Sequence, residues 1–232
     1  MALENDGGSS RPYRGVQAAD RLADRRGRLM DAGLDLLGAD QQDIAELTVR
    51  GICQEAGVAV RYFYESFTDK DEYVAAVFDS VVANLAATTQ GAVAAAQGRN
   101  QPRAGMGNIV RAIDSDPRIG RLLFSTQLAN PVIVRKRSES TALFAILSGQ
   151  YVGQTLHIPA NDRIRAVANF VVGGVGQTIS AWLAGDVHLR PDELVDQLGA
   201  VLDVLTNPKL IQERIIGTVT PPEDPTVSDA AL

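Results

Sequence analysis

The stretch Thr48–Tyr73 (TVRGICQEAGVAVRYFYESFTDKDEY) constrains the fold of this chain more than any other segment. Thr48 precedes apolar residues spaced i, i+3, i+4, so its hydroxyl can cap the free N–H groups of a helix that begins beside it. Gly57 ends that helix, because glycine adopts the left-handed conformation without a clash from a Cβ atom. Phe63 and Phe67, four residues apart, mark the buried side of a second short helix. The pattern predicts two helices crossed over a tight turn, which is a helix-turn-helix.

With Asp69 as the cap of the following helix, the stretch resembles the DNA-binding segment of the TetR family of bacterial transcriptional regulators. The chain departs from the family pattern at Cys53, at Ser66 and at Arg61-Tyr62. The family usually has alanine, then tyrosine or histidine, and then small residues at these places. The residues that match the pattern are Thr48, Val49, Ile52, Ala56, Gly57, Val58, Phe63, Tyr64, Phe67, Asp69, Lys70 and Asp71.

The resemblance implies an all-α fold with an N-terminal three-helix helix-turn-helix DNA-binding domain. A larger C-terminal helical domain for ligand binding and dimerisation follows, which gives about nine helices in total. Residues 1–17 have no periodic apolar face and are expected to be a disordered basic arm. This arm either reaches the DNA minor groove through Arg11 and Arg14 or is a solvated tail. The remaining domain bounds are 18–70 for the DNA-binding domain, 71–206 for the C-terminal domain and 207–232 for a loose C-terminal tail.

Apolar spacing, caps and helix-breaking residues predict where the other helices lie. The segment Gly98–Arg103 (GRNQPR) predicts a break, since glycine and proline interrupt helices. Asp116-Pro117 and Asn130-Pro131 each place a capping residue before a proline, which is typical of a helix start. Helices are therefore expected at 20–37, 69–96, 105–115, 117–128, 131–156, 161–185 and 191–205.

Charge and composition narrow the class of protein. The net charge is −6, but residues 11–28 carry six arginines against two aspartates, and DNA affinity depends on the phosphates that a local surface neutralises. One cysteine and two histidines argue against a disulfide framework or a Cys/His metal site. No apolar run approaches the ~20 residues that cross a bilayer, and residues 1–20 lack the apolar core of a signal peptide. A cytoplasmic protein is expected.

The resemblance makes the second helix of the motif the recognition helix, which lies in the major groove of DNA. Arg61 can donate twice to guanine, and Val60 can touch a thymine methyl group. Lys70 lies in the first turn of the next helix, whose free N–H groups also favour a phosphate. Each of these side chains alone could equally be a solvated surface residue. The expected DNA contacts are Thr48, Arg50, Ala59, Val60, Arg61, Tyr62, Tyr64 and Lys70.

The glycine-rich run Val171–Gly176 (VVGGVG) is a weak nucleotide-loop signal, since no predicted strand precedes it. Within a helix, such glycines permit another helix to approach closely. By resemblance, the last two helices form the four-helix interface of a homodimer, which would place two recognition helices on a near-palindromic operator. The expected interface residues are Gly173, Gly174, Trp182, Leu194, Leu198 and Leu202.

A ligand cavity is expected between the helices of the C-terminal domain, with apolar or aromatic walls and a few polar groups. Its ligand would be a small apolar or aromatic molecule, although each lining residue could equally be ordinary core. Cys53 is expected to be a small buried hydrophobe, since a redox role would need exposure and a lowered pKa. The expected lining residues are Phe124, Gln127, Phe144, Tyr151, Asn169 and Phe170.

The resemblance implies a repressor that a small-molecule ligand releases from its operator. The helix beginning near Asp69 would carry the signal, because it leaves the DNA-binding domain and enters the ligand domain. A regulator without ligand control, either an activator or one controlled by a protein partner, is the alternative. An enzyme is disfavoured, because the sequence has two distant histidines and no compact acid/base motif. No catalytic residue, metal site or cofactor is expected.

Overall fold

A computed structural model describes residues 13–39, 47–98 and 100–205 of the chain. Within these ranges the chain forms nine α-helices and no strand, which confirms the predicted all-α fold. The helices are α1 (Tyr13–Leu37), α2 (Val49–Glu55), α3 (Val60–Tyr64), α4 (Lys70–Ala95), α5 (Asn100–Ser115), α6 (Pro117–Phe124), α7 (Pro131–Leu156), α8 (Asp162–Ala184) and α9 (Pro191–Leu205).

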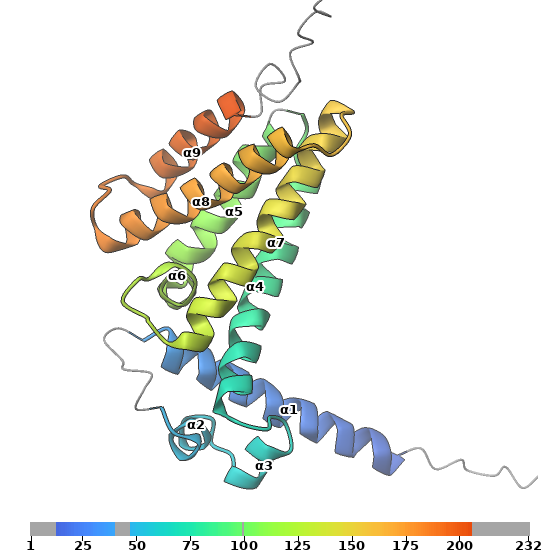
Figure 1. Cartoon of the computed structure of the whole chain (residues 1–232). Helices are drawn as coiled ribbons and strands as arrows, with labels where there is room; N and C mark the ends of the chain where they lie inside the picture. The colour runs from blue at the N-terminus through green and yellow to red at the C-terminus, as the bar shows by residue number, and fades with distance from the viewer. Residues whose placement is uncertain (1–12, 40–46, 99, 206–232) are drawn as a thin grey trace, which may run out of the picture.

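The helices form a small N-terminal unit and a larger bundle, joined by α4 (Figure 1). Helix α1 packs against α2, α3 and the start of α4, while α4 continues between α5 and α7. Helix α8 lies against α7, and α9 lies against α5. Helix α4 therefore belongs to both parts and links the unit formed by α1–α3 to the bundle.

Side-chain caps fix where the helices begin. The Thr48 hydroxyl accepts a hydrogen bond from the Gly51 N–H at 3.1 Å, and Asp69 accepts one from the Glu72 N–H at 2.8 Å. Asn130 and Asn161 cap α7 and α8 in the same way. Caps of this type stabilise a helix by about 1 kcal/mol each. The predicted starts of α4, α6, α7, α8 and α9 are therefore confirmed to within a residue or two.

Helix α1 begins at Tyr13, seven residues before the predicted start at Asp20. Almost all residues from 19 to 28 are exposed, so this part of the helix carries no apolar stripe that the sequence could reveal. Leu22, in the middle of this stretch, is 41% exposed. Residues 13–17, which were predicted to belong to the disordered arm, are therefore part of α1. The remaining residues of the arm, 1–12, like the predicted tail 207–232, lie outside the described residues.

Helix α5 begins at Asn100, although the sequence predicted a start at Gly105. Pro102 is tolerated in its first turn, because the first four N–H groups of a helix have no intrahelical partner to lose. The predicted break is real but shorter, and it lies around Ala96–Gly98.

Helix α6 ends at Phe124 rather than at the predicted Leu128. The guanidinium group of Arg137 on α7 donates to the carbonyl oxygens of Leu122 at 2.7 Å and Leu128 at 3.2 Å. The Ser180 hydroxyl on α8 donates to the Phe124 carbonyl at 3.0 Å. These side chains satisfy carbonyl groups that would otherwise require another helical turn.

The main hydrophobic core does not stop at the predicted domain boundary after Lys70. It contains Leu29 and Phe63 from the N-terminal unit together with Tyr73, Leu122 and Ile133 from α4, α6 and α7. A smaller cluster joins α5 to α8 and α9. The helix-turn-helix unit is therefore packed directly against the larger bundle.

Candidate nucleic-acid interface

The turn between α2 and α3 has the geometry that its sequence demands. Gly57 has a φ of 61°, in the left-handed region that favours glycine. The Arg28 side chain of α1 donates to the carbonyl oxygens of Ala56 at 2.8 Å and Gly57 at 2.6 Å. The end of α2 and the turn are thereby fixed to α1.

Helix α3 has one buried side and one open side. Phe63 is fully buried, and its ring lies 5.5 Å from the ring of Phe67 and 5.4 Å from that of Tyr73. On the other side, Val60 is 40% exposed and Tyr64 is 59% exposed. Residues four apart share a face of a helix, so these two side chains form one open surface. Ala59 and Arg61 are also exposed, and Tyr62 is half-buried.

Two arginines lie over the ring of Tyr62. The guanidinium carbon of Arg25 is 4.0 Å from the ring centroid, and that of Arg61 is 4.6 Å from it. Arg61 also donates to the Tyr62 hydroxyl, which raises the pKa of the guanidinium. Arg25 pairs at 3.4 Å with Glu65. The side chain of Arg61 is thus exposed and held against its neighbour Tyr62.

The arginines of α1 are less available to DNA than their number suggests. Arg26 donates to the Ser66 carbonyl at 2.9 Å and lies over the Phe67 ring, while Arg28 holds the turn after α2. Arg11 lies outside the described residues. The local positive charge therefore holds the unit together, with only part of it left to attract phosphates.

The remaining predicted DNA contacts surround α3. Thr48 and Arg50 are exposed at the start of α2, and Lys70 is half-buried in the first turn of α4. The N–H groups at that turn are partly occupied, because Asp69 accepts from Glu72. The Glu72 carboxylate in turn accepts from the Thr68 N–H at 2.6 Å, which lowers the pKa of Glu72. A phosphate here would depend mainly on the Lys70 side chain.

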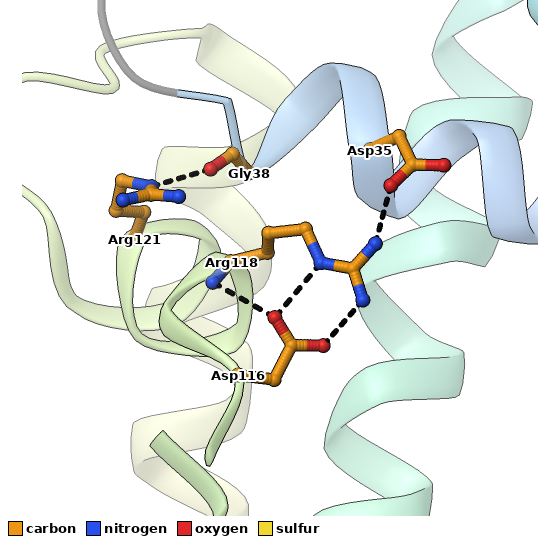
Figure 2. Close-up of polar contacts among 5 residues, drawn as sticks. All are labelled: Asp35, Gly38, Asp116, Arg118 and Arg121. Atoms are coloured by element: carbon orange, nitrogen blue, oxygen red, sulfur yellow. Dashed lines mark hydrogen bonds and ion pairs between the residues drawn. The ribbon is translucent and has the colours of Figure 1, made fainter. Parts of the chain in front are cut away.

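A polar junction links the N-terminal unit to α6 (Figure 2). The Arg118 guanidinium bonds Asp116 through Nε at 2.8 Å and Nη2 at 2.6 Å, and it also pairs with Asp35 of α1. These bonds lower the pKa of Asp116 and raise that of Arg118. Arg121 donates to the carbonyl of Gly38, and a Cβ atom at Gly38 would lie 2.5 Å from the Cβ of Arg118. The end of α1 thus abuts the start of α6.

A cavity of about 780 Å³ lies between α4, α5, α7 and α8, with the end of α6 at one side. Phe124, Phe144 and Tyr151 line it, in agreement with the sequence prediction. Gln127, Asn169 and Phe170 do not line it, and all three are exposed, Phe170 by 67%. In the N-terminal part of α8 the lining residues are Ile164, Val167, Ala168 and Val171, which share one face of the helix. Asn169 and Phe170 lie outside that stripe.

Three of the residues predicted for a dimer interface are buried within the chain. Leu194, Leu198 and Leu202 are exposed by 0%, 5% and 7%, and the first two pack against Val110 of α5. Their assignment to a surface shared between chains was wrong, because the stripe on α9 faces α5.

The other three predicted interface residues lie on α8. Trp182 is half-buried in the smaller cluster and donates through Nε1 to the Leu189 carbonyl at 2.9 Å. Gly173 and Gly174 are exposed, with nothing within 4 Å of a Cβ atom built on either. Gly173 also borders the cavity. Among the described helices, α8 alone is long and apolar enough to cross a membrane. Helices of soluble proteins pass the same test, so this property is weak evidence for a membrane protein.

Cys53 is buried in the core beneath α2, and burial raises the pKa of its thiol. The structure therefore confirms a small buried hydrophobe at this position. Among the described residues, no group of three or more histidine, cysteine, aspartate or glutamate side chains could hold a metal ion.

Comparison with protein-family models gives no match to this chain, and comparison with curated proteins gives none either. Solved structures do match. The fatty acid degradation regulator FadR from Bacillus halodurans aligns with a TM-score of 0.63 at 15% identity, over 77% of this chain and 94% of that one. FadR from Bacillus subtilis in complex with stearoyl-CoA aligns with a TM-score of 0.60 at 16% identity, over 78% and 97% of the two chains. A TetR-like transcriptional regulator from Rhodococcus sp. RHA1 aligns with a TM-score of 0.58 at 17% identity, over 82% and 97%. This chain has the fold of the TetR family of transcriptional regulators.

Proposed function

We propose that this chain is a cytoplasmic transcriptional regulator that binds a near-palindromic operator as a homodimer. A small molecule bound in the cavity releases it from DNA, so it acts as a repressor. The observation that carries the proposal is the open side of α3, where Ala59, Val60, Arg61 and Tyr64 are exposed while Phe63 anchors the helix. A short helix held in this way can enter the major groove and present its N-terminal residues to base edges.

Individual roles on this surface follow from the chemistry of the side chains. Arg61 can donate twice to the O6 and N7 atoms of guanine, and Val60 can contact the methyl group of thymine. Thr48, Arg50, Tyr64 and Lys70 surround α3 and would contact phosphates, which set the register of the protein on DNA. Arg61 must leave the Tyr62 hydroxyl to reach a base, and that hydroxyl then becomes free to contact DNA.

Exposed apolar residues on α8 and α9 support a dimer. Phe170, Val201 and Val204 are 67%, 43% and 64% exposed, and few residues of the apolar α8 are buried within the chain. Gly173 and Gly174 leave room for close approach of a second helix. The proposed interface therefore consists of the open faces of α8 and α9 rather than of the buried leucines.

Helix α4 supports control by a ligand. Its first turns, with Tyr73 and Val74, belong to the core under α3, whereas Phe78, Val82 and Leu85 line the cavity. A ligand that binds one position of α4 better than another would change the separation of the two α3 helices. Couplings of this kind are typically about 1–3 kcal/mol. FadR from Bacillus subtilis, which shares the fold, was solved with stearoyl-CoA bound.

Selection of bound duplexes from a random pool by the full chain tests this function. The expected result is an enriched sequence with two-fold symmetry, whose complex in a gel shift is lost when the correct ligand is added. Absence of any enriched sequence would reject the DNA-binding function. An enriched operator that no small molecule releases would leave a regulator controlled by other means, which is the alternative function.

A further inference from the structure

The cavity is long. On α4 its lining residues extend from Phe78 to Ala94, and on α7 from Arg137 to Gln154. With a rise of 1.5 Å per residue, each of these runs spans roughly 24–25 Å. The ion pair of Asp79 with Lys136, at 2.7 Å, joins the two helices at one end of this span. At the other end, Gln101 bonds both Tyr151 and the Val93 carbonyl. The two helices therefore run side by side along the length of the cavity.

One end of the cavity carries a positive charge. Most lining residues are apolar, none of the described ones is acidic, and Arg137 is the one cation among them. Arg137 lies where α6 ends, since it donates to the Leu122 carbonyl, and Thr126, Ser140 and Ser180 also line the cavity. At the far end, the hydroxyl of Tyr151 donates to Gln101 at 2.6 Å, and the other polar lining residues there, Gln90, Gln150 and Gln154, are uncharged.

The charge of Arg137 has no counter-ion among the described residues. Its Nε, Nη1 and Nη2 atoms donate to the neutral carbonyl oxygens of Arg121, Leu122 and Leu128. These bonds leave one of the five N–H groups, on Nη1, without a protein partner in the described chain. Burial lowers the pKa of Arg137 to about 10, so the group stays charged at neutral pH. A half-buried charge with only neutral partners is favourably placed to meet an anion.

We propose that the cavity binds a single-chain amphiphile with an anionic head group, whose head pairs with Arg137 and whose chain lies along α4 and α7. The length and apolar walls accept an extended alkyl chain, and the head would add a charge-assisted hydrogen bond from Nη1. This assigns a ligand class to the cavity of the proposed function. It also differs from the small apolar or aromatic ligand that the sequence alone suggested.

Binding of dodecanoate, dodecyl phosphate and dodecanol to the full chain tests this assignment. Twelve carbons with C–C bonds of about 1.5 Å extend to roughly 15 Å, which fits the cavity. Calorimetric titration below the micelle concentrations, without DNA, should show that at least one of the anions binds about ten-fold tighter than dodecanol or more. The better of the two anions identifies whether the head is a carboxylate or a phosphate. Equal binding of dodecanol, or no binding of either anion, would overturn the proposal.

Arg137→Gln should abolish the preference for the anion and leave dodecanol binding unchanged. Arg135→Gln is the matched control, because Arg135 lies on the same helix but is exposed and pairs with Glu139. A preference that survives in Arg137→Gln would overturn the assignment to this residue. Circular dichroism would show whether loss of the bonds to α6 unfolds Arg137→Gln. In that case, the comparison of the two anions with dodecanol on the unchanged chain still tests whether the cavity prefers an anionic head group. The titration contains no DNA, so it tests the ligand class separately from ligand control of DNA binding. If the anion binds here but does not release the operator in a gel shift, ligand control is contradicted and the assigned ligand class still stands.

Discussion

Gly33→Ala tests whether α1 and α4 pack as closely as the structure shows. Gly33 is buried, and a Cβ atom there would lie 2.7 Å from the Tyr73 hydroxyl and nearer still to Val77. Non-bonded heavy atoms prefer about 3.5–4.0 Å, so α4 would have to move by roughly 1 Å. Tyr73 cannot swing away, because it is fully buried and its hydroxyl donates to the Leu29 carbonyl at 2.7 Å. Overpacking of this kind typically costs about 1–3 kcal/mol.

The overpacking cost of Gly33→Ala is best measured by comparison with Gly27→Ala on the same helix. Gly27 is exposed, and nothing lies within 4 Å of a Cβ atom built on it. Both changes gain about 0.5–1 kcal/mol, because alanine favours a helix more than glycine does. The difference between the two variants therefore isolates the overpacking cost of about 1–3 kcal/mol.

Urea unfolding followed by circular dichroism at a fixed protomer concentration measures this difference. A fixed concentration matters, because the stability of a dimer depends on it. Gly27→Ala should have a higher unfolding midpoint than the unchanged chain, and Gly33→Ala a lower one. A Gly33→Ala chain as stable as Gly27→Ala would refute the close packing of α1 on α4.

Three further changes test other contacts. Tyr73→Phe should lower the free energy of unfolding by about 0.5–1.5 kcal/mol, because it removes the buried hydrogen bond from the Tyr73 hydroxyl to the Leu29 carbonyl; an unchanged urea midpoint would contradict this. Arg61→Ala should weaken binding to the selected operator about ten-fold while random DNA is little affected, and equal losses in fluorescence anisotropy would reduce Arg61 to a phosphate contact. Lys70→Ala should weaken both complexes alike and reduce the salt slope by about 1, so an unchanged slope would exclude the phosphate contact.

Local features of this fold could be predicted well from the sequence. Thr48, Asp69, Asn130 and Asn161 precede helices, and each forms the cap that its side chain suggests. Gly57 has the positive φ expected at the end of α2. Such features depend on residues a few positions apart, so they need no knowledge of distant contacts.

Features that depend on which helix faces which could not be predicted in the same way. Leu194 and Leu198 form a clear apolar stripe, but a stripe does not reveal whether its partner is α5 or another chain. Phe170 lies one position before Val171, and only Val171 lines the cavity. That distinction depends on the rotation of α8 about its axis, which is set by packing.

The roles of long basic side chains were also missed. Arg137 was not among the expected site residues, although it bonds the Leu122 carbonyl at the end of α6. Arg26 and Arg28 were counted toward a DNA-facing charge, yet they hold carbonyl groups of the turns near α3. An arginine side chain can bond partners far away in sequence, so its spacing does not indicate its role.

Methylation interference on the selected operator tests most directly the central claim that α3 enters the major groove in two copies. Guanine N7 lies in the major groove, so a methyl group there blocks a recognition helix. Two symmetric patches of interference, one helical turn of about 10 base pairs apart or a multiple of it, are predicted. Interference at a single patch would contradict the dimer, and binding with no interference in the major groove would contradict the role of α3.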